Sequence, residues 1–274
     1  MPSVFEPETV AEAAAVFRDG TRVAIDRNVG DAATLSTVRL NRILEHEPGD
    51  LTAIVEAGVR LSELQAALAP HGQMLALDPP GDPTIGACLA GDLSGPRRHR
   101  YGAMRDLVIG LTVVLADGTI ASSGGKVVKN VAGYDLGKLF AGSRGRLGLI
   151  ARVALRLHTR PRVEKTLTGP AELWPAVHRS QLDPVAVDLH WPGKLALLVE
   201  RECAFDGFAE DDASVWSESA ERQLRGTKVR WDGGACLLAR PGPGVAWVEG
   251  AARQPWSPLA ERVRAAFDRE GRLV

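Results

Sequence analysis

The stretch GGKVVKNVAGYDLGKLFAGSRGRLGLI, residues 124–150, repeats glycine among apolar and basic residues. Glycine inside a regular element is less favourable than alanine by about 0.5–1 kcal/mol, so a chain that repeats it uses positive φ or close approach to its backbone. We therefore expect another group, either a second segment of the chain or a bound molecule, to lie against this stretch.

The glycine spacing excludes two phosphate-binding motifs. Gly137-Lys138 is followed by Leu139 where a P-loop needs Ser or Thr, and Ala132 stands where its first glycine belongs. The later glycines lie three residues apart and precede a strand, unlike the G-x-G-x-x-G of a Rossmann fold: these are Gly142, Gly145 and Gly148.

A second glycine-rich segment lies upstream. Residues 78–105, DPPGDPTIGACLAGDLSGPRRHRYGAMR, hold four prolines and five glycines with hardly any hydrophobic periodicity. That is long for a connection without secondary structure inside a compact domain, and ordered loops of this length are usually functional.

Together the two glycine-rich segments, in this order and spacing, resemble the FAD-binding domain of the vanillyl-alcohol oxidase (PCMH) type. Within that family the chain looks most like the smaller flavoprotein subunit of bacterial glycolate oxidase. The resemblance covers roughly residues 5–160 and implies an α+β fold in which two subdomains hold FAD between them. It implies a PCMH-type FAD-binding domain over 1–160 and a truncated, small α/β cap domain over 161–274.

The resemblance also implies which residues contact the cofactor. Glycine and small residues let the main chain bring its N–H groups close to a pyrophosphate. The matching positions are Asp78, Pro80, Thr84, Ile85, Gly86, Gly91, Asp92, Ser94, Tyr101, Gly102, Gly145, Gly148 and Ile150.

The sequence departs from the family pattern at two places. The N-terminal glycine-rich loop is replaced by Ile25-Asp26-Arg27-Asn28-Val29-Gly30-Asp31, with one glycine and two carboxylates, and Asp92 stands where asparagine is usual. Both changes place negative charge near a phosphate, so we expect weakened FAD binding or a subunit that depends on its partners. The family's histidine anchor is absent between Asp26 and Asp31, so we expect the FAD to be non-covalent.

The cap region carries little recognisable chemistry. The larger, catalytic relatives hold a metal and a hydroxy acid with an H-x-G-D-G-N-x-H motif, which this sequence lacks. The resemblance therefore implies an oxidoreductase subunit for a small 2-hydroxy acid that works with a larger flavoprotein and an iron–sulfur subunit. A non-catalytic assembly subunit with a decayed flavin site is the alternative.

The polar residues around the glycine blocks allow two interpretations. In the first, one arginine of Pro96-Arg97-Arg98-His99-Arg100 stabilises the reduced flavin or a substrate carboxylate. In the second, this run is a solvated loop. His71, His178 and His190 are isolated in the sequence, and no general base or metal site is evident.

Composition excludes several partners. With 33 basic and 34 acidic side chains the formal charge is −1, which leaves no positive field to attract nucleic acid or an anionic membrane. Three widely spaced cysteines without a C-x-x-C pair fit a reducing cytoplasm. Neither a signal peptide nor a long apolar segment is present, so we expect a soluble cytoplasmic chain with at most peripheral membrane contact through its partners.

Hydrophobic periodicity predicts the regular elements. Helices are expected over 7–20, 59–69, 134–142, 214–226 and 258–273. Strands are expected over 21–26, 33–40, 51–58 and 152–158, with hairpins over 106–125 around Asp117-Gly118 and over 185–202.

Overall fold

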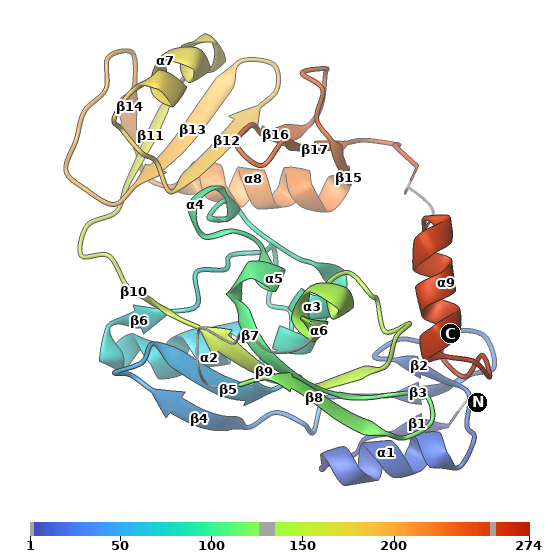
Figure 1. Ribbon diagram of the computed structural model, residues 1–274. Helices are drawn as coiled ribbons and strands as arrows, with labels where there is room; N and C mark the ends of the chain where they lie inside the picture. The colour runs from blue at the N-terminus through green and yellow to red at the C-terminus, as the bar shows by residue number, and fades with distance from the viewer. Residues whose placement is uncertain (1–2, 126–134, 253–255) are drawn as a thin grey trace.

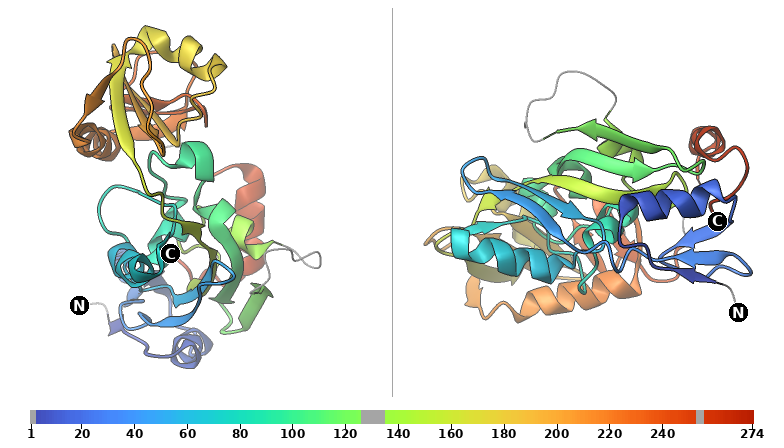
Figure 2. Two further views of the ribbon diagram at one scale, coloured as in Figure 1. Left: turned by 90° about the vertical axis from the view of Figure 1, so that its left-hand side faces the viewer. Right: turned by 90° about the horizontal axis from the view of Figure 1, so that it is seen from below.

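The computed structural model describes residues 3–125, 135–252 and 256–274, so residues 126–134 of the glycine-rich stretch lie outside it. The described chain forms an N-terminal domain and a cap domain, drawn one above the other in Figure 1. Each domain is built on its own antiparallel sheet. The fold is α+β, as expected, and the left view of Figure 2 shows its two lobes.

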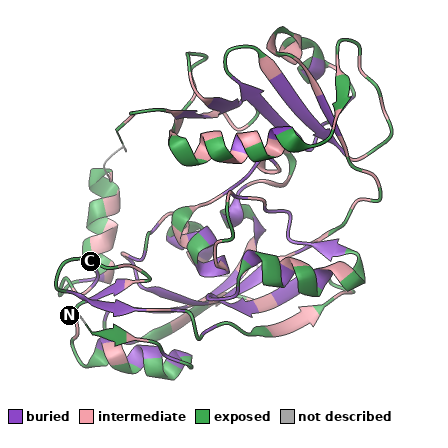
Figure 3. Ribbon diagram, turned by 180° about the vertical axis from the view of Figure 1, so that it is seen from behind, coloured by how far each residue is buried: buried purple, intermediate pink, exposed green. Residues whose placement is uncertain are grey.

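A five-stranded antiparallel sheet forms the centre of the N-terminal domain. Its strand order is β4 (Ile43–Glu47), β5 (Thr52–Glu56), β9 (Leu149–Arg156), β7 (Val108–Val114) and β8 (Ile120–Gly124). The alternation in β9 predicted a strand with one exposed face. Only Arg152 and Arg156 are partly exposed, because β9 is central in the sheet and its other residues are buried. Figure 3 shows how far each part of the chain is buried, with buried residues in purple.

Four short helices pack against this sheet and bury its main core. They are α2 (Leu61–Leu68), α3 (Ile85–Gly91), α5 (Met104–Leu107) and α6 (Leu136–Phe140). The absence of periodicity predicted no regular structure in residues 78–105, and this is wrong, since α3, α4 (Arg98–Tyr101) and α5 begin there. The side chain of Thr84 caps α3, and Asp92 ends it with φ +45°, so local capping overrides the low helix propensity of glycine.

The second subdomain packs α1 (Val10–Arg18) on a small parallel sheet of order β1 (Val4–Phe5), β3 (Ala33–Leu35) and β2 (Val23–Ile25). The predicted stripe of α1 is confirmed, since these side chains are buried: Val10, Ala13, Ala14 and Phe17. A short antiparallel ribbon joins β6 (Gln73–Met74), after the 3₁₀ turn η1 (Ala69–His71), to β10 (His158–Thr159).

The cap is a seven-stranded antiparallel sheet with helices on it. Its order is β14 (Ala209–Asp211), β11 (Lys165–Pro170), β13 (Lys194–Val199), β12 (Ala186–His190), β16 (Leu238–Arg240), β17 (Val245–Val248) and β15 (Thr227–Arg230). The expected hairpin of β12 and β13 and the expected helix α8 (Ser214–Arg225) are confirmed. The 3₁₀ turn η2 (Ala171–Leu173) and α7 (Trp174–Arg179) complete the cap.

The last helix, α9 (Pro258–Phe267), packs on the N-terminal domain rather than on the cap sheet. The ring of Phe267 meets that of Phe140 edge-on at 6.0 Å between centroids. Beyond it Leu273 bridges to Val23 in parallel, beside β2. Division of the chain after residue 160 stays a proposal, but within it this packing assigns residues 258–274 to the N-terminal side (Figure 1).

Candidate cofactor site at the domain interface

Two adjoining cavities run from the N-terminal domain to the cap. We call the first, of about 290 Å³, the strand-end cavity because it lies where β2 ends. The second, of about 940 Å³, is the inter-domain cleft between the loop after α3 and the cap strands β15 and β17. Gly91 and Arg144 line both cavities, so the two adjoin there, and we call them together the groove.

Small residues line much of the strand-end cavity. Gly86 in α3 donates its N–H to the carbonyl of Ala57 at 2.7 Å, and a Cβ on Gly86 would lie 2.8 Å from that of Ala57. Gly145 has φ +76°, and a Cβ there would meet Ile25 at 3.3 Å. The other small residues are Ala87, Ala90 and Gly91. Glycine at 86 and 145 therefore brings α3, β5 and the end of β2 close around one space.

The inter-domain cleft is lined by charged groups from both domains. Asp92 Oδ2 lies 3.8 Å from Lys228 Nζ on β15 and 3.9 Å from Arg98 Nη1. The Oδ1 atom of Asp92 is buried and has no hydrogen-bond partner among the described residues. Lys228 keeps 36% of its side chain exposed, and partial burial, followed by repulsion from Arg98, lowers its pKa. Arg230 adds a second cation from the cap.

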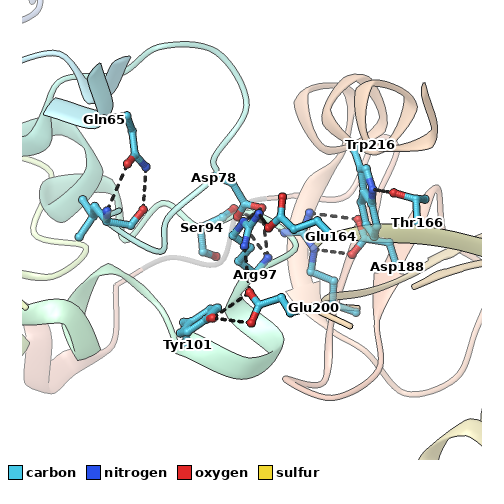
Figure 4. Close-up of polar contacts among 12 residues, drawn as sticks. Gln65, Asp78, Ser94, Arg97, Tyr101, Glu164, Thr166, Asp188, Glu200 and Trp216 are labelled. Carbon is cyan, nitrogen blue, oxygen red and sulfur yellow. Dashed lines mark hydrogen bonds and ion pairs between the residues drawn. The ribbon is translucent and has the colours of Figure 1, made fainter. Parts of the chain in front are cut away.

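Arg97 joins the two domains through two carboxylates of the cap (Figure 4). It bonds to Glu164 at the start of the cap and lies 3.5 Å from Glu200, and it also lies 3.8 Å from Asp78 of its own domain. Tyr101 donates its hydroxyl to Glu200 at 2.9 Å. Burial and then this carboxylate raise the pKa of Tyr101 to about 12. Arg100 also pairs with a carboxylate of the cap, Asp183, at 3.2 Å. The basic run 97–100 therefore contributes ion pairs between the two domains.

A buried ion pair lies behind this contact. Arg240 on β16 donates to both carboxylate oxygens of Asp188 on β12, at 2.8 and 3.3 Å, and neither side chain is exposed. Arg240 also donates to the backbone carbonyl of Ser94 at 3.4 Å, and Gln223 donates to the same oxygen at 2.9 Å. Its guanidinium lies over the ring of Trp247 at 4.5 Å. The cap therefore holds the loop that lines the cleft.

The structure brings most of the expected cofactor residues to the groove. Those lining a cavity are Pro80, Gly86, Gly91, Asp92, Ser94, Gly145 and Ile150.

The other expected residues have different surroundings. Thr84 caps α3 and Ile85 is in the core, while Asp78 and Tyr101 lie in the contact with the cap. A Cβ on Gly102 would meet Asp106 at 2.7 Å, and one on Gly148 would meet the carbonyl oxygen of Val114 at 2.6 Å. These two glycines therefore serve backbone packing.

The histidines considered from sequence lie outside both cavities. His190 bonds to Ser219 Oγ at 2.7 Å, and His178 packs on Trp174 at 5.2 Å between centroids. His71 meets His46 edge-on, and burial lowers the pKa of His99, which packs near Trp174. Within residues 3–125, 135–252 and 256–274, no group of three His, Cys, Asp or Glu side chains is placed to hold a metal.

Four lining cations were not selected from the sequence: Arg27, Arg144, Lys228 and Arg230. Arg27 belongs to the altered loop 25–31, but the prediction for this loop was based on its two carboxylates. Lys228 had no signal, since only the packing of the cap places β15 over the loop after α3.

The groove fits a dinucleotide. It joins a smaller, mostly apolar cavity lined by small residues to a larger cleft, and Arg144 lies at the junction. A flat aromatic ring suits the mostly apolar cavity, and a guanidinium group suits a pyrophosphate. Residues 10–124 match the family model described as FAD binding domain.

Over these residues the chain is therefore similar to FAD-binding domains. Its curated relatives include glycolate oxidase subunit GlcE of Escherichia coli, 36% identical over 55% of this chain and 45% of that protein. Subunit GlcD of Bacillus subtilis is 39% identical over 55% of this chain and 32% of that protein. D-lactate dehydrogenase [cytochrome] 1 of Saccharomyces cerevisiae is 36% identical over 54% of this chain and 26% of that protein.

The chain spans less than half the length of these relatives. A solved structure of alkyldihydroxyacetonephosphate synthase shares the fold, with a TM-score of 0.57 and 20% identity over 68% of this chain and 38% of that one. In the described part of the chain, every helix is too short or too polar to cross a membrane.

Proposed function

We propose that the chain is an FAD-dependent oxidoreductase subunit that acts on a small 2-hydroxy acid such as glycolate. The observation that carries this proposal is the inter-domain cleft. It adjoins the strand-end cavity of an FAD-binding domain, and the cap contributes Lys228 and Arg230 to its lining. Two cationic side chains suit an acid whose carboxylate is ionised at neutral pH.

When bound, FAD supplies a hydride acceptor. The residues of the chain have the other tasks of binding and exclusion. Lys228 and Arg230 attract the carboxylate, and Trp231 and Trp247 cover the cap side of the cleft against water. Arg240 and Gln223, through the Ser94 carbonyl, hold the lower wall in place. None of the described histidines lines the cleft, so this chain offers no imidazole base there.

We further propose that the subunit works in a cytoplasmic complex with a larger flavoprotein and an iron–sulfur subunit, which takes the electrons onward. Two relatives are named as subunits of glycolate oxidase, which supports membership of a complex.

Dye reduction tests this dependence on partners. The purified chain is loaded with FAD, and steady-state reduction of an artificial dye is measured with glycolate and with D-lactate. We expect little or no turnover from the chain alone. Turnover on the order of 10 s⁻¹, an ordinary enzyme value, would show a self-sufficient enzyme instead.

A non-catalytic assembly subunit is the second candidate. The observation that favours it is that Asp26 and Asp92, both carboxylates, line the two cavities. Negative charge at these positions opposes an anionic cofactor. The absorbance spectrum of the chain purified from its own cytoplasm separates the two candidates, because an assembly subunit with a decayed site carries no flavin.

A further inference from the structure

Two arginines from distant parts of the N-terminal domain meet at the strand-end cavity. Arg27 is the second residue after the end of β2, and Arg144 precedes Gly145. The backbone N–H of Arg144 donates to the carbonyl of Ala90 at 2.9 Å, which fixes this segment to the end of α3. Arg144 and Gly145 have φ of +53° and +76°, so two consecutive left-handed residues turn the chain toward Ile25.

Arg27 has a donor that the described residues do not satisfy. Its Nη2 donates to the backbone oxygen of Val274, while its Nε is buried and has no hydrogen-bond partner among them. A buried N–H without an acceptor is unfavourable, and more so on a charged group. The cavity that Arg27 lines is the place from which an acceptor could come.

The carboxylate that precedes Arg27 in the sequence is engaged elsewhere. The Oδ1 of Asp26 accepts from the Thr37 N–H at 2.7 Å, and its Oδ2 accepts from the Thr37 hydroxyl at 2.6 Å. Burial, followed by repulsion from Arg146 and Arg144, lowers the pKa of Arg27. Like charges gathered around a cavity are stabilised when an anion lies between them.

We infer that Arg27 and Arg144 form the subsite that holds the pyrophosphate of FAD. The planar guanidinium can bind phosphate oxygens through two parallel hydrogen bonds, and its charge complements the diphosphate. The arginines take over from backbone N–H groups in a loop that has one glycine, Gly30. Because Arg144 also lines the inter-domain cleft, the subsite lies where a diphosphate would link the two halves of the dinucleotide. The inference rests on the FAD site described above.

Binding of FAD and of riboflavin, which lacks the diphosphate, tests the subsite. Dissociation constants are measured by flavin fluorescence for the 274-residue chain and for Arg27→Gln and Arg144→Gln. We expect each variant to weaken FAD binding about ten- to hundredfold, the range for a lost charged hydrogen bond, and to leave riboflavin binding within about twofold. Lysine at either position should restore part of the loss, since it keeps the charge without the fork.

Arg22→Gln is the matched control, because Arg22 is exposed, precedes β2 and pairs with Asp31 at 3.8 Å outside the cavity. Unchanged FAD binding in both variants, or an equal loss for riboflavin, would overturn the inference. If a variant does not fold, binding measurements on the wild-type chain test the inference instead. FAD binding must then weaken with added NaCl and compete with ADP, and riboflavin binding must not depend on salt. A chain that binds neither flavin would instead refute the FAD site itself.

Discussion

Arg240 on β16 and Asp188 on β12 form an ion pair, with 2.8 Å between Arg240 Nε and Asp188 Oδ1, and neither side chain is exposed. Figure 4 labels Asp188 in this contact. A buried pair of this kind costs desolvation free energy, and removal of one partner leaves a buried charge without compensation. Since Arg240 also bonds to the Ser94 carbonyl, the pair connects the core of the cap to the lining of the cleft.

Arg240→Met should lower the free energy of unfolding of the cap by about 3–5 kcal/mol, and Arg240→Met with Asp188→Leu should recover most of that loss. Tryptophan fluorescence during urea unfolding measures this, because five of the six tryptophans belong to the cap, while Trp256 lies 5.1 Å from Arg146 of the N-terminal domain. Arg225→Met is the control, since the Arg225–Glu249 pair is 63% exposed on both sides and should cost less than about 1 kcal/mol. Equal costs for the buried and the exposed pair would contradict this prediction.

The contact between the domains should respond to pH through Asp78. Desolvation raises the pKa of Asp78 from 3.8 to about 6, and Arg97 and Arg240 oppose this rise. The folded chain then binds this proton more tightly than the unfolded chain. The stabilising contribution is therefore full below about pH 4 and is lost as the pH rises through about 6. The side chain keeps 33% of its surface exposed, and water there limits the size of the change.

Urea unfolding of wild type and Asp78→Asn between pH 4.5 and 8 isolates this effect. We expect wild type to lose stability relative to the variant as the pH rises, with no further change above about pH 7. Asp82→Asn is the control that should show no pH dependence in this range, because hydrogen bonds from Ser62 lower the pKa of Asp82 from 3.8 and its contribution is lost only at lower pH. Parallel stability curves for wild type and Asp78→Asn would rule out the role of Asp78.

Gly148→Ala should destabilise the N-terminal domain by about 1–3 kcal/mol. The residue has φ +147°, and a Cβ would lie 2.6 Å from the backbone oxygen of Val114 on β7, which cannot move freely within the sheet. Thermal unfolding followed by far-UV circular dichroism measures the loss. Gly49→Ala is the control, because no atom lies within 4 Å of a Cβ at that position and its φ is not positive. A Gly148→Ala melting curve that matches the Gly49→Ala curve would refute the steric argument.

Cys88 should resist alkylation in the folded chain. Burial in α3 raises the pKa of its thiol to about 12, so at pH 8 only about one molecule in 10⁴ carries the reactive thiolate. Cys203 and Cys236 are partly exposed and should react with iodoacetamide first. Mass spectrometry of the native chain should find two modified cysteines, and Cys88→Ala should give the same number. Rapid modification of Cys88 without urea would show that α3 opens in the native state.

Local sequence patterns predicted the elements whose cause is local. The apolar stripe of α1 and the Asp117-Gly118 turn between β7 and β8 depend on neighbouring residues, and both are confirmed. The helix α3 was not predicted, because a run of glycine and alanine becomes helical here only when Thr84 caps it and Ala57 packs on Gly86.

The charged contacts of the site could not be read from local patterns. Arg97 and Glu200, or Asp92 and Lys228, meet only after the cap sheet has formed and docked. The family resemblance grouped Gly91, Asp92 and Ser94 as candidate site residues because they belong to one short segment. All three line the cleft.

The return of α9 makes the N-terminal domain discontinuous along the chain. A fragment that stops at residue 160 would leave Phe140 without Phe267 and would deprive Val23 of its neighbour Leu273. It would also lose Arg272, which donates to the carbonyls of Phe17 and Ala116. The cap is therefore an insertion with two attachments, and a cap-free protein has to be made by internal excision and a joining linker rather than by truncation.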